Sequence, residues 1–481
     1  MEKSPVRIWI EEHRQEFIED MMEFFRIRSV SEPQSGEFPF GEGCAHMLDA
    51  ALSMSERYGF SIENHEYYCG SAILKGNEEK EIGVFSHIDV VDEGKGWATK
   101  PYEPVIKDGW IYARGSSDNK GPAVASLYAL RYLKEQGKTL KHTIRLYYGC
   151  SEEHGMEDIE YYKKHYPIPS FSIVPDASFP VCYAEKGILE GTFERKLEGN
   201  VISFTAGHAN NAVPASAEAV LKVLDIEEGN GELSVKKRIE KKLAGKEAAK
   251  EPDISLEFIE DGLVKVSATG KTAHAAFPEG SESAAVKLAD YLIENGLADR
   301  RAAECLRFLR DAFEGYYGSG MGIAYEDSLS GKLTMIGGMV KTKDGALSQT
   351  MNIRYPASID QDKLVSDIEE AAKRFGWEIT AIKNNHSHAV DPEDEKVKKL
   401  SQICDQVWQR HFEPYAMGGG TYARKLPNAV AYGPGILDQK KPGWPDHGKG
   451  HQPDECVCIE NMMKAIEIYT LALIALDNMV D

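Results

Sequence analysis

The sequence predicts an α/β protein with more than one domain, on three observations. The chain has 481 residues, which exceeds the size at which a single hydrophobic core stops growing. Short apolar runs rich in β-branched and aromatic residues occur at 81–86, 143–149 and 171–175. Apolar residues recur with helical spacing over 122–137, between the first two runs. Buried strands with covering helices are therefore expected from about residue 67 to residue 180.

Both ends of the chain are expected to be helical. Near the amino terminus, Ser4 is a suitable helix cap and Pro5 suits the first turn. This region contains no uncharged apolar stretch of the kind found in secretory signals. The apolar run after Ile459 is interrupted by Glu467 and Asp477, so we interpret it as a closing core helix and not as a membrane span.

The middle of the chain has a different texture. From about Glu185 to Lys383, lysine and glutamate runs are followed by patterned strands and helices around Gly270 and Ile353. The most charged segment, 235–251, is expected to be a solvated helix. Glycine-rich loops resume after this region. Periodicity alone leaves two organisations open: a middle domain inserted into a discontinuous first domain, or three domains in a row.

Composition excludes several classes of partner. The formal net charge is -21, whereas nucleic acids and anionic membranes both select a basic protein surface. We therefore expect a small molecule or a protein as partner, with no nucleic acid and no membrane. The eight cysteines include no CxxC pair, which suits a reducing compartment better than a disulfide framework. A cytoplasmic protein is expected.

Metal-capable side chains follow three of the expected strands and precede the expected helix. In chain order they are His87 and Asp89, Asp118, Glu152 and Glu153, and Asp176. In open α/β sheets, ligands bind beyond the carboxyl ends of the strands. The sequence therefore predicts that imidazole and carboxylate ligands gather at one edge of the sheet.

This ligand set suits two divalent ions. In the His-x-Asp arrangement, Asp89 shares a face with His87 and can accept its second ring N–H, which fixes the metal-binding tautomer. Imidazole with carboxylates suits zinc, manganese or cobalt, and two ions would remove the repulsion among the acids. Asp118 is the expected bridging ligand. Of the adjacent pair Glu152 and Glu153, one is expected to bind metal while its neighbour faces the attacking water as general base.

A further ligand is expected from the glycine-rich loop 447–457, which offers His447 and His451. Spacing alone does not choose between them. The stretch 318–323 resembles a dinucleotide-binding loop, but Ile323 stands at the last glycine position, so a turn is expected there. Cys150 lacks the setting of a nucleophile and is expected to be a small buried residue.

The motifs that carry this chemistry resemble those of a known family. "SHIDVVDEGKGWATKPYEPVIKDGWIYARGSSDNKGP" (86–122), "SEEHG" (151–155), "VPDASFP" (174–180) and "GKGHQPDE" (448–455) are similar to motifs of the peptidase V-type dipeptidases. Those enzymes lie within the larger family that includes acetylornithine deacetylase, succinyl-diaminopimelate desuccinylase and carnosinase. The likeness spans nearly the whole chain, and the motifs occur in the family's order.

The resemblance implies a zinc-peptidase-like catalytic domain, with a mixed sheet flanked by helices, and an inserted α+β lid domain. The expected boundaries are 1–185 and 384–481 for the catalytic domain and 186–383 for the lid. Two divalent ions are implied, with zinc as the first expectation and manganese or cobalt as alternatives. One ion would be held by His87, Asp118 and Asp176, and the other by Asp118, Glu153 and His451, with Glu152 as general base.

The resemblance also assigns residues outside the metal site. "AGHANNAVP" points to Asn211, "GKTAHAAFPEG" to His274 and "MNIRYP" to Arg354. In related dipeptidases the lid histidine stabilises the oxyanion, and the arginine binds the terminal carboxylate of the substrate. Gly419 and Gly420 of "GGGTYAR" are expected to add backbone donors for the same carboxylate.

The sequence departs from the family pattern at two positions. Ala206 replaces the first glycine of the lid element that contains Asn211. This replacement touches no proposed catalytic group. Asn119 follows the bridging aspartate where many relatives have aspartate, at a peptide bond that is cis in the family.

These observations predict a monomeric, cytoplasmic, metal-dependent dipeptidase that cleaves short peptides with a free amino terminus. An N-acyl amino-acid amidohydrolase with the same two-metal site is the alternative, and the state of the substrate's amino end separates the two. A third interpretation is a metal-dependent peptide-binding protein without catalysis on the same fold. The complete set of base, ligands and oxyanion donor disfavours it.

Overall fold

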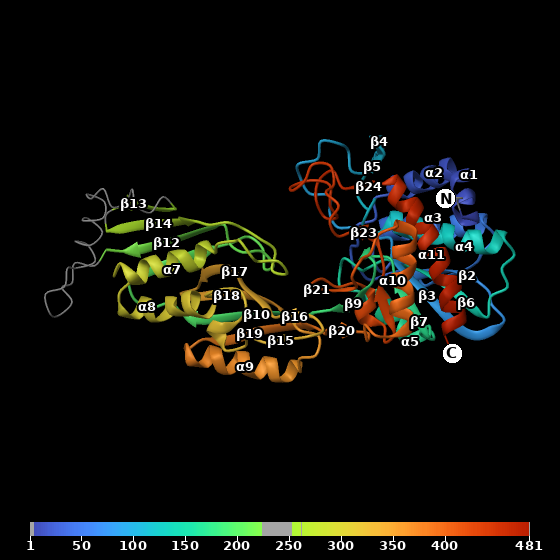
Figure 1. Cartoon of the computed structure of the whole chain (residues 1–481). Coiled ribbons are helices and arrows are strands. Elements are labelled where there is room, and N and C mark those ends of the chain that lie inside the picture. The colour runs from blue at the N-terminus through green and yellow to red at the C-terminus, as the bar shows by residue number, and fades with distance from the viewer. Residues whose placement is uncertain (1–3, 224–252, 261, 481) are drawn as a thin grey trace. The chain divides into compact units, whose positions relative to one another are not determined.

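The chain divides into two compact units (Figure 1). The computed structural model describes residues 4–223, 253–260 and 262–480, so the charged segment 235–251 lies outside the described residues. The first unit comprises Met1–Ala184, His388–Ala416 and Gly420–Asp481, and the second comprises Glu185–Ser387 with Met417–Gly419. Each unit has a hydrophobic core of its own. The chain of the first unit is therefore interrupted by almost the whole of the second.

A mixed sheet forms the centre of the first unit. Its strand order is β1-β2-β6-β3-β7-β22-β9-β20, with β21 paired to β9. Strand β3 runs parallel to β6 and β7, and β22 runs parallel to β7, whereas β1, β2 and β6 pair antiparallel in sequence. The strands are β1 (Ser61–His65), β2 (Cys69–Leu74), β3 (Glu78–His87), β6 (His142–Gly149), β7 (Phe171–Val174), β9 (Cys182–Glu185), β20 (His388–Ala389), β21 (Tyr415–Met417) and β22 (Ala429–Ala431). The predicted mixed α/β class is confirmed.

Helices cover this sheet and supply most of the core. They are α1 (Pro5–Glu12), α2 (Arg14–Phe25), α3 (Glu42–Arg57), α4 (Lys120–Glu135), α5 (Glu157–His165), α10 (Glu395–Trp408) and α11 (Ile459–Met479). Helix α4 contacts β3 and β6, and α11 contacts α4. Because α4 is buried on every side from Lys120 to Leu133, it is a central core helix. The side chain of Ser4 accepts a hydrogen bond from Arg7 N, which confirms the predicted cap.

Two small sheets tie distant segments of the first unit together. Strand β5 (Trp110–Tyr112) pairs antiparallel with β4 (Val105–Lys107) and with β24 (Cys456–Cys458), which comes from near the end of the chain. Strand β8 (Ala177–Phe179) pairs parallel with β23 (Pro434–Ile436). The pairing of β24 with β5 holds the loop before α4 next to the loop before α11.

The second unit is built on an antiparallel sheet with the order β13-β14-β12-β11-β17-β18-β10-β19. Its strands are β10 (Gly187–Lys196), β11 (Val201–Ala206), β12 (Ser216–Lys222), β13 (Ile254–Glu260), β14 (Leu263–Thr269), β17 (Thr334–Lys343), β18 (Ala346–Tyr355) and β19 (Glu378–Asn385). A two-stranded ribbon pairs β15 (Glu326–Asp327) with β16 (Gly331–Lys332). Helices α7 (Ala284–Glu294), α8 (Arg300–Arg307) and α9 (Gln361–Arg374) accompany the sheet, and a short π-helix, η2 (Phe308–Ala312), continues α8 (Figure 1).

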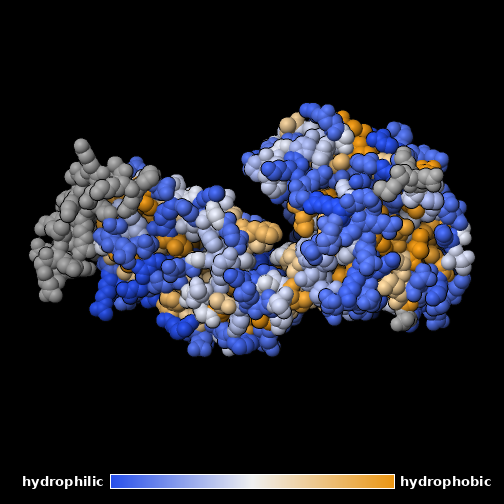
Figure 2. Space-filling view, in the orientation of Figure 1, coloured by the Kyte–Doolittle hydropathy of each residue, from blue (hydrophilic) through white to orange (hydrophobic). Residues whose placement is uncertain are grey.

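The surface agrees with the composition. On the face shown in Figure 2, hydrophilic residues cover most of each unit, and hydrophobic residues lie among them in smaller groups. Within the described ranges, no helix has the length and apolar character needed to cross a membrane. All eight cysteines are free, and Cys150 is fully buried as predicted.

A buried histidine in the first unit predicts a loss of stability in mild acid. His65 is 1% exposed, and its Nε2 lies 3.0 Å from Ser71 Oγ. Burial lowers the pKa of His65 to about 4, from 6.5. Between these two pKa values the unfolded chain binds a proton that the folded state excludes. The contribution of neutral His65 to the free energy of unfolding is therefore complete above pH 6.5 and is lost as pH falls towards 4. The shift corresponds to about 3 kcal/mol.

We expect His65→Gln to flatten this pH dependence. Urea unfolding of the wild type and of the variant, each at pH 7 and pH 4.5, measures the effect as a difference of differences. Other groups titrate equally in both proteins and cancel. An equal loss of stability in both proteins would show that His65 is not the group responsible.

Candidate metal centre

The predicted ligands meet at the carboxyl ends of three parallel strands of the first unit. His87 is the last residue of β3, and Asp176 follows β7. Glu152 and Glu153 follow β6 in a tight turn. The turn brings both carboxylates to the cluster, because their ligand atoms and one of His87 lie within 4.8 Å of one another.

The described residues contain three groups whose ligand atoms are close enough to share a metal ion. They are His87, Asp118 and Asp176; His87, Glu152 and Glu153; and Asp118, Glu153 and His451. Imidazole nitrogens and carboxylate oxygens are the donors that zinc, manganese and cobalt accept. Because the groups share members, the donor set fits two adjacent ions better than one.

Asp118 lies between the two histidines. Its Oδ1 is 3.0 Å from His87 Nε2, and its Oδ2 is 3.2 Å from His451 Nε2. The same nitrogen of His451 is 2.9 Å from Glu153 Oε1, and His87 Nε2 is 3.7 Å from Asp176 Oδ2. One carboxylate with an oxygen towards each histidine has the geometry that a ligand bridging two ions requires. The peptide bond after Asp118 is cis, as the resemblance implies.

His87 is oriented by the backbone more directly than by the expected carboxylate. Its Nδ1 lies 3.0 Å from the carbonyl oxygen of Asp89 and 3.4 Å from Asp89 Oδ1. A ring N–H donated from Nδ1 leaves Nε2 to bind metal. The side chain of Asp89 instead accepts the backbone N–H groups of Glu152 at 3.2 Å and Glu153 at 3.1 Å. Asp89 therefore fixes the glutamate turn.

The structure separates the two histidines of the glycine-rich loop. His451 points its Nε2 at Asp118 and Glu153, whereas His447 Nδ1 lies 2.8 Å from Asp454 Oδ2. His451 has φ +65°, a conformation that the sequence does not signal at a histidine. The loop backbone also lies close to Asp118, since a Cβ added at Gly450 would be only 2.8 Å from Asp118 Oδ2.

The cluster holds several acidic groups close together in a buried site. Burial raises the pKa of Glu152 well above its usual range, and the neighbouring carboxylates of Asp176 and Glu153 add to this rise. Burial, followed by the charge of Asp118, raises the pKa of Glu153 to about 7. Burial opposes the charging of His451, but hydrogen bonds to Asp118 and Glu153 outweigh it and raise its pKa to about 11. Divalent cations would stabilise the ionised carboxylates in place of these protons.

Two residues to which the sequence analysis gave no role support the ligands. Asp158 Oδ2 accepts the backbone N–H groups of Cys150 and Ser151 at 2.7 and 3.0 Å, and also the hydroxyl of Tyr422. Asp158 therefore holds the start of the turn that carries the glutamates. Asn119 donates from Nδ2 to Asp176 Oδ1 at 3.0 Å, a hydrogen bond that the aspartate found in many relatives could not donate when ionised.

The predicted lid residues lie in the second unit in two connected places. The segment of Asn211 pairs with that of His274, since Ala275 N donates to Asn211 O at 2.9 Å. Arg354 on β18 is 6% exposed, and its Nη1 donates to Gly418 O at 3.1 Å. A Cβ at Gly418 would lie 2.9 Å from that of Ala276, two residues after His274. Gly418 therefore connects both places.

The two expected backbone-donor glycines fall in different units. Gly419 belongs to the second unit with Gly418, and Gly420 belongs to the first. A Cβ at Gly420 would meet the guanidinium of Arg424, 1.9 Å from its Nη2. A side chain at this position would therefore displace Arg424.

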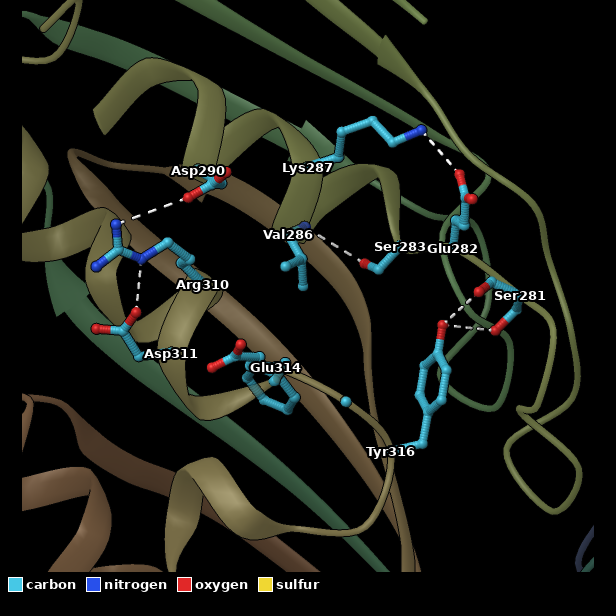
Figure 3. A pocket seen from close by; sticks show the side chains of 12 residues that line it. Ser281, Glu282, Ser283, Val286, Lys287, Asp290, Arg310, Asp311, Glu314 and Tyr316 are labelled. Atoms are coloured by element: carbon cyan, nitrogen blue, oxygen red, sulfur yellow. Dashed lines mark hydrogen bonds and ion pairs between the residues drawn. The ribbon is translucent and has the colours of Figure 1, made fainter. Parts of the chain in front are cut away.

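A cavity of about 640 Å³ in the second unit contains none of the predicted site residues (Figure 3). Its basic side chains are already paired, with Arg310 beside Asp290 and Asp311, and Lys287 beside Glu282 (Figure 3). This cavity therefore does not coincide with the predicted reactive side chains. The candidate site is the group of histidines and carboxylates in the first unit that could hold metal ions.

Comparison with known proteins identifies the family. Residues 83–475 match the peptidase family M20/M25/M40. A putative dipeptidase, YtjP, of Bacillus subtilis is 33% identical over 471 residues, which cover 96% of this chain and 97% of the relative. The chain belongs to the peptidase family M20/M25/M40. The resemblance drawn from the motifs is confirmed at the level of this family.

Other similar proteins extend the comparison. The Beta-Ala-Xaa dipeptidase of Lactobacillus delbrueckii subsp. lactis is 31% identical over 468 residues and covers 95% of each chain. Human carnosine dipeptidase 1 has the same fold, with a TM-score of 0.57 and 14% identity over 98% of each chain. The dipeptidase Dug1p of Saccharomyces cerevisiae matches with a TM-score of 0.56 and 14% identity over 98% of each chain. The two curated dipeptidases therefore match 95–96% of this chain, and the two solved dipeptidases share its fold.

Proposed function

We propose that this protein is a metal-dependent dipeptidase that hydrolyses short peptides with a free amino terminus. The observation that carries the proposal is Asp118, whose two oxygens face His87 and His451 within a cluster of three further carboxylates. The full-length likeness to dipeptidases supports the substrate class. Zinc is the ion we propose first, and manganese or cobalt fits the same donors.

The proposed ligand sets follow the geometry. His87, Asp118 and Asp176 would hold one ion, and Asp118, Glu153 and His451 would hold the other. When bound, the two ions supply Lewis-acid polarisation of the scissile carbonyl and acidify the attacking water. Asp89 keeps Glu152 and Glu153 in register through their backbone N–H groups.

Glu152 is the proposed general base. No described residue donates a hydrogen bond to its carboxylate, in contrast to Glu153, which His451 contacts at 2.9 Å. Glu152 can therefore take a proton from the attacking water and deliver it to the leaving amine.

We propose that the second unit serves as a lid that supplies the remaining polar groups. His274 is the proposed oxyanion donor, and Asn211 is a proposed substrate-binding residue. Arg354 is the proposed partner of the substrate's terminal carboxylate, with Gly419 and Gly420 as backbone donors. We further propose that the protein acts as a cytoplasmic monomer on small peptides. Its eight free cysteines support a reducing compartment.

Parallel rates on a dipeptide and its N-acetyl form test the substrate assignment. We expect cleavage of the free dipeptide and little cleavage of the blocked compound. Preference for the N-acetyl form would replace the dipeptidase with an N-acyl amino-acid amidohydrolase at the same metal site. Binding of dipeptide without turnover in fully metallated protein would indicate a peptide-binding protein.

The two loop histidines provide a matched pair of variants. His451→Asn should weaken the affinity for the second ion by more than about 100-fold, because a direct ligand is lost. Loss of a residue that only hydrogen-bonds to a ligand typically weakens metal affinity by about 10- to 100-fold. His447→Asn removes only the contact with Asp454 and should retain both ions. Metal content after dialysis against a weak chelator distinguishes them. The reverse pattern would make His447 the ligand.

A further inference from the structure

Glu455 is a fully buried carboxylate that has no part in the proposed reaction. It lies four residues after His451 and directly precedes β24, which pairs with β5 (Figure 1). The pairing continues one residue further, where Ala113 N donates to Glu455 O at 2.9 Å. The side chain of Glu455 is thereby brought to the loop 114–118 that leads to α4.

Five donors converge on the two oxygens of Glu455. Oε2 accepts from Arg114 Nη1 at 2.8 Å and from Gly115 N at 3.0 Å. Oε1 accepts from the backbone N–H of Ser117 at 2.8 Å, from the hydroxyl of Ser117 at 3.1 Å and from the backbone N–H of Asp118 at 3.1 Å. Since four of the five donors are N–H groups, only an ionised carboxylate satisfies both sides.

The charge of Glu455 is balanced by an arginine that is itself held in place. Arg114 is 1% exposed, and its guanidinium lies 5.1 Å from the ring centroid of Trp97. Its Nη2 is 3.4 Å from Asp92 O and 3.3 Å from Glu93 O. A buried ion pair with additional hydrogen bonds on both partners defines one geometry, whereas removing either partner leaves a buried charge.

We infer that Glu455 is a positioning residue of the metal centre, which holds the backbone of Asp118 and links it to the loop of His451. The inference rests on the proposed function, since it takes this cluster to bind divalent ions. With the backbone N–H of Asp118 fixed, the side chain keeps one oxygen towards each histidine before any ion binds. Preorganisation of this kind lowers the ordering cost of binding.

Glu455→Gln is the sharpest test, because it preserves size and shape. Whichever way the amide turns, its NH₂ faces N–H donors, so the hydrogen bonds accepted by one of the two carboxylate oxygens are lost. We expect the affinity for Co²⁺ or Zn²⁺ to fall by about 10- to 100-fold. At saturating metal, kcat should fall while KM changes little. The absorption spectrum of the cobalt-loaded protein should also change, because the ligand geometry is altered.

Asp477→Asn is a matched control for a purely structural effect. Asp477 is another buried carboxylate of the first unit and accepts the backbone N–H groups of Lys141 and His142 at 3.1 and 2.8 Å. We expect this variant to lower the melting temperature while keeping the metal affinity and the cobalt spectrum of the wild type. Equal losses of metal affinity in both variants would overturn the inference.

The outcomes separate this inference from the proposed function. A wild-type protein that binds no divalent ion would refute the proposed function. A wild type that binds two ions, with Glu455→Gln unchanged in affinity and spectrum, would overturn only the positioning role. If Glu455→Gln does not fold, Ser117→Ala replaces it, because it removes one donor to Oε1. We then expect about 5-fold weaker metal binding, and unchanged binding would overturn the inference.

Discussion

Glu152→Gln is expected to lower kcat by about 10²- to 10⁴-fold, the range that general acid–base groups contribute. The amide cannot take a proton from the attacking water. The two ions should remain, because the proposed ligand of the adjacent pair is Glu153, which contacts His451 at 2.9 Å. Steady-state rates on a free dipeptide, with metal content measured on the same samples, check the result.

Glu153→Gln is the matched control for this variant. The same chemical change one residue along should lower metal affinity, and added metal should restore part of the activity. Both backbone N–H groups remain bound to Asp89 in either variant, so the turn itself is kept. Near-normal turnover by Glu152→Gln would remove Glu152 from the role of base.

Asp118→Ala is expected to abolish both metal binding and turnover. Its carboxylate is the only proposed ligand common to both ions, with Oδ1 towards His87 and Oδ2 towards His451. Its loss also leaves two histidines facing a smaller set of acids. We expect the affinity for each ion to fall by more than about 100-fold, which exceeds the effect of losing a residue that only hydrogen-bonds to a ligand. Titration of the metal-free variant with Co²⁺ measures this directly.

Asp118→Asn separates loss of charge from loss of the side chain. The amide keeps only one oxygen that can bind an ion, so we expect a single ion to bind at reduced affinity. The backbone N–H of this residue still donates to Glu455, which preserves the loop in both variants. Retention of two tightly bound ions in Asp118→Ala would contradict the bridging role.

Much of the first unit was predictable because its signals are local. The strands β3, β6 and β7 were expected from short apolar runs, and they begin or end within a few residues of the predicted limits. The rule that ligands lie beyond the carboxyl ends of parallel strands then placed His87 and Asp176 together. Helix α1 followed from its Ser4 cap and the Pro5 after it.

Other features depend on contacts between distant segments and left no local signal. The choice of His451 over His447 depends on how one glycine-rich loop folds against Asp118, more than 300 residues earlier. The hydrogen bonds between Glu455 and the loop 114–118 depend on the pairing of β24 with β5. Asp89 showed a detectable spacing signal, but its side chain binds the glutamate turn and not primarily the ring of His87.

Hydrolysis of one free dipeptide by metal-stripped protein, before and after adding zinc, manganese or cobalt, tests the central claim most directly. The account predicts no turnover without metal and recovery when about two equivalents of ion are added. The ion that restores the highest rate would identify the working metal. Full activity in metal-free protein, or no activity with any of the three ions, would contradict a metal-dependent dipeptidase.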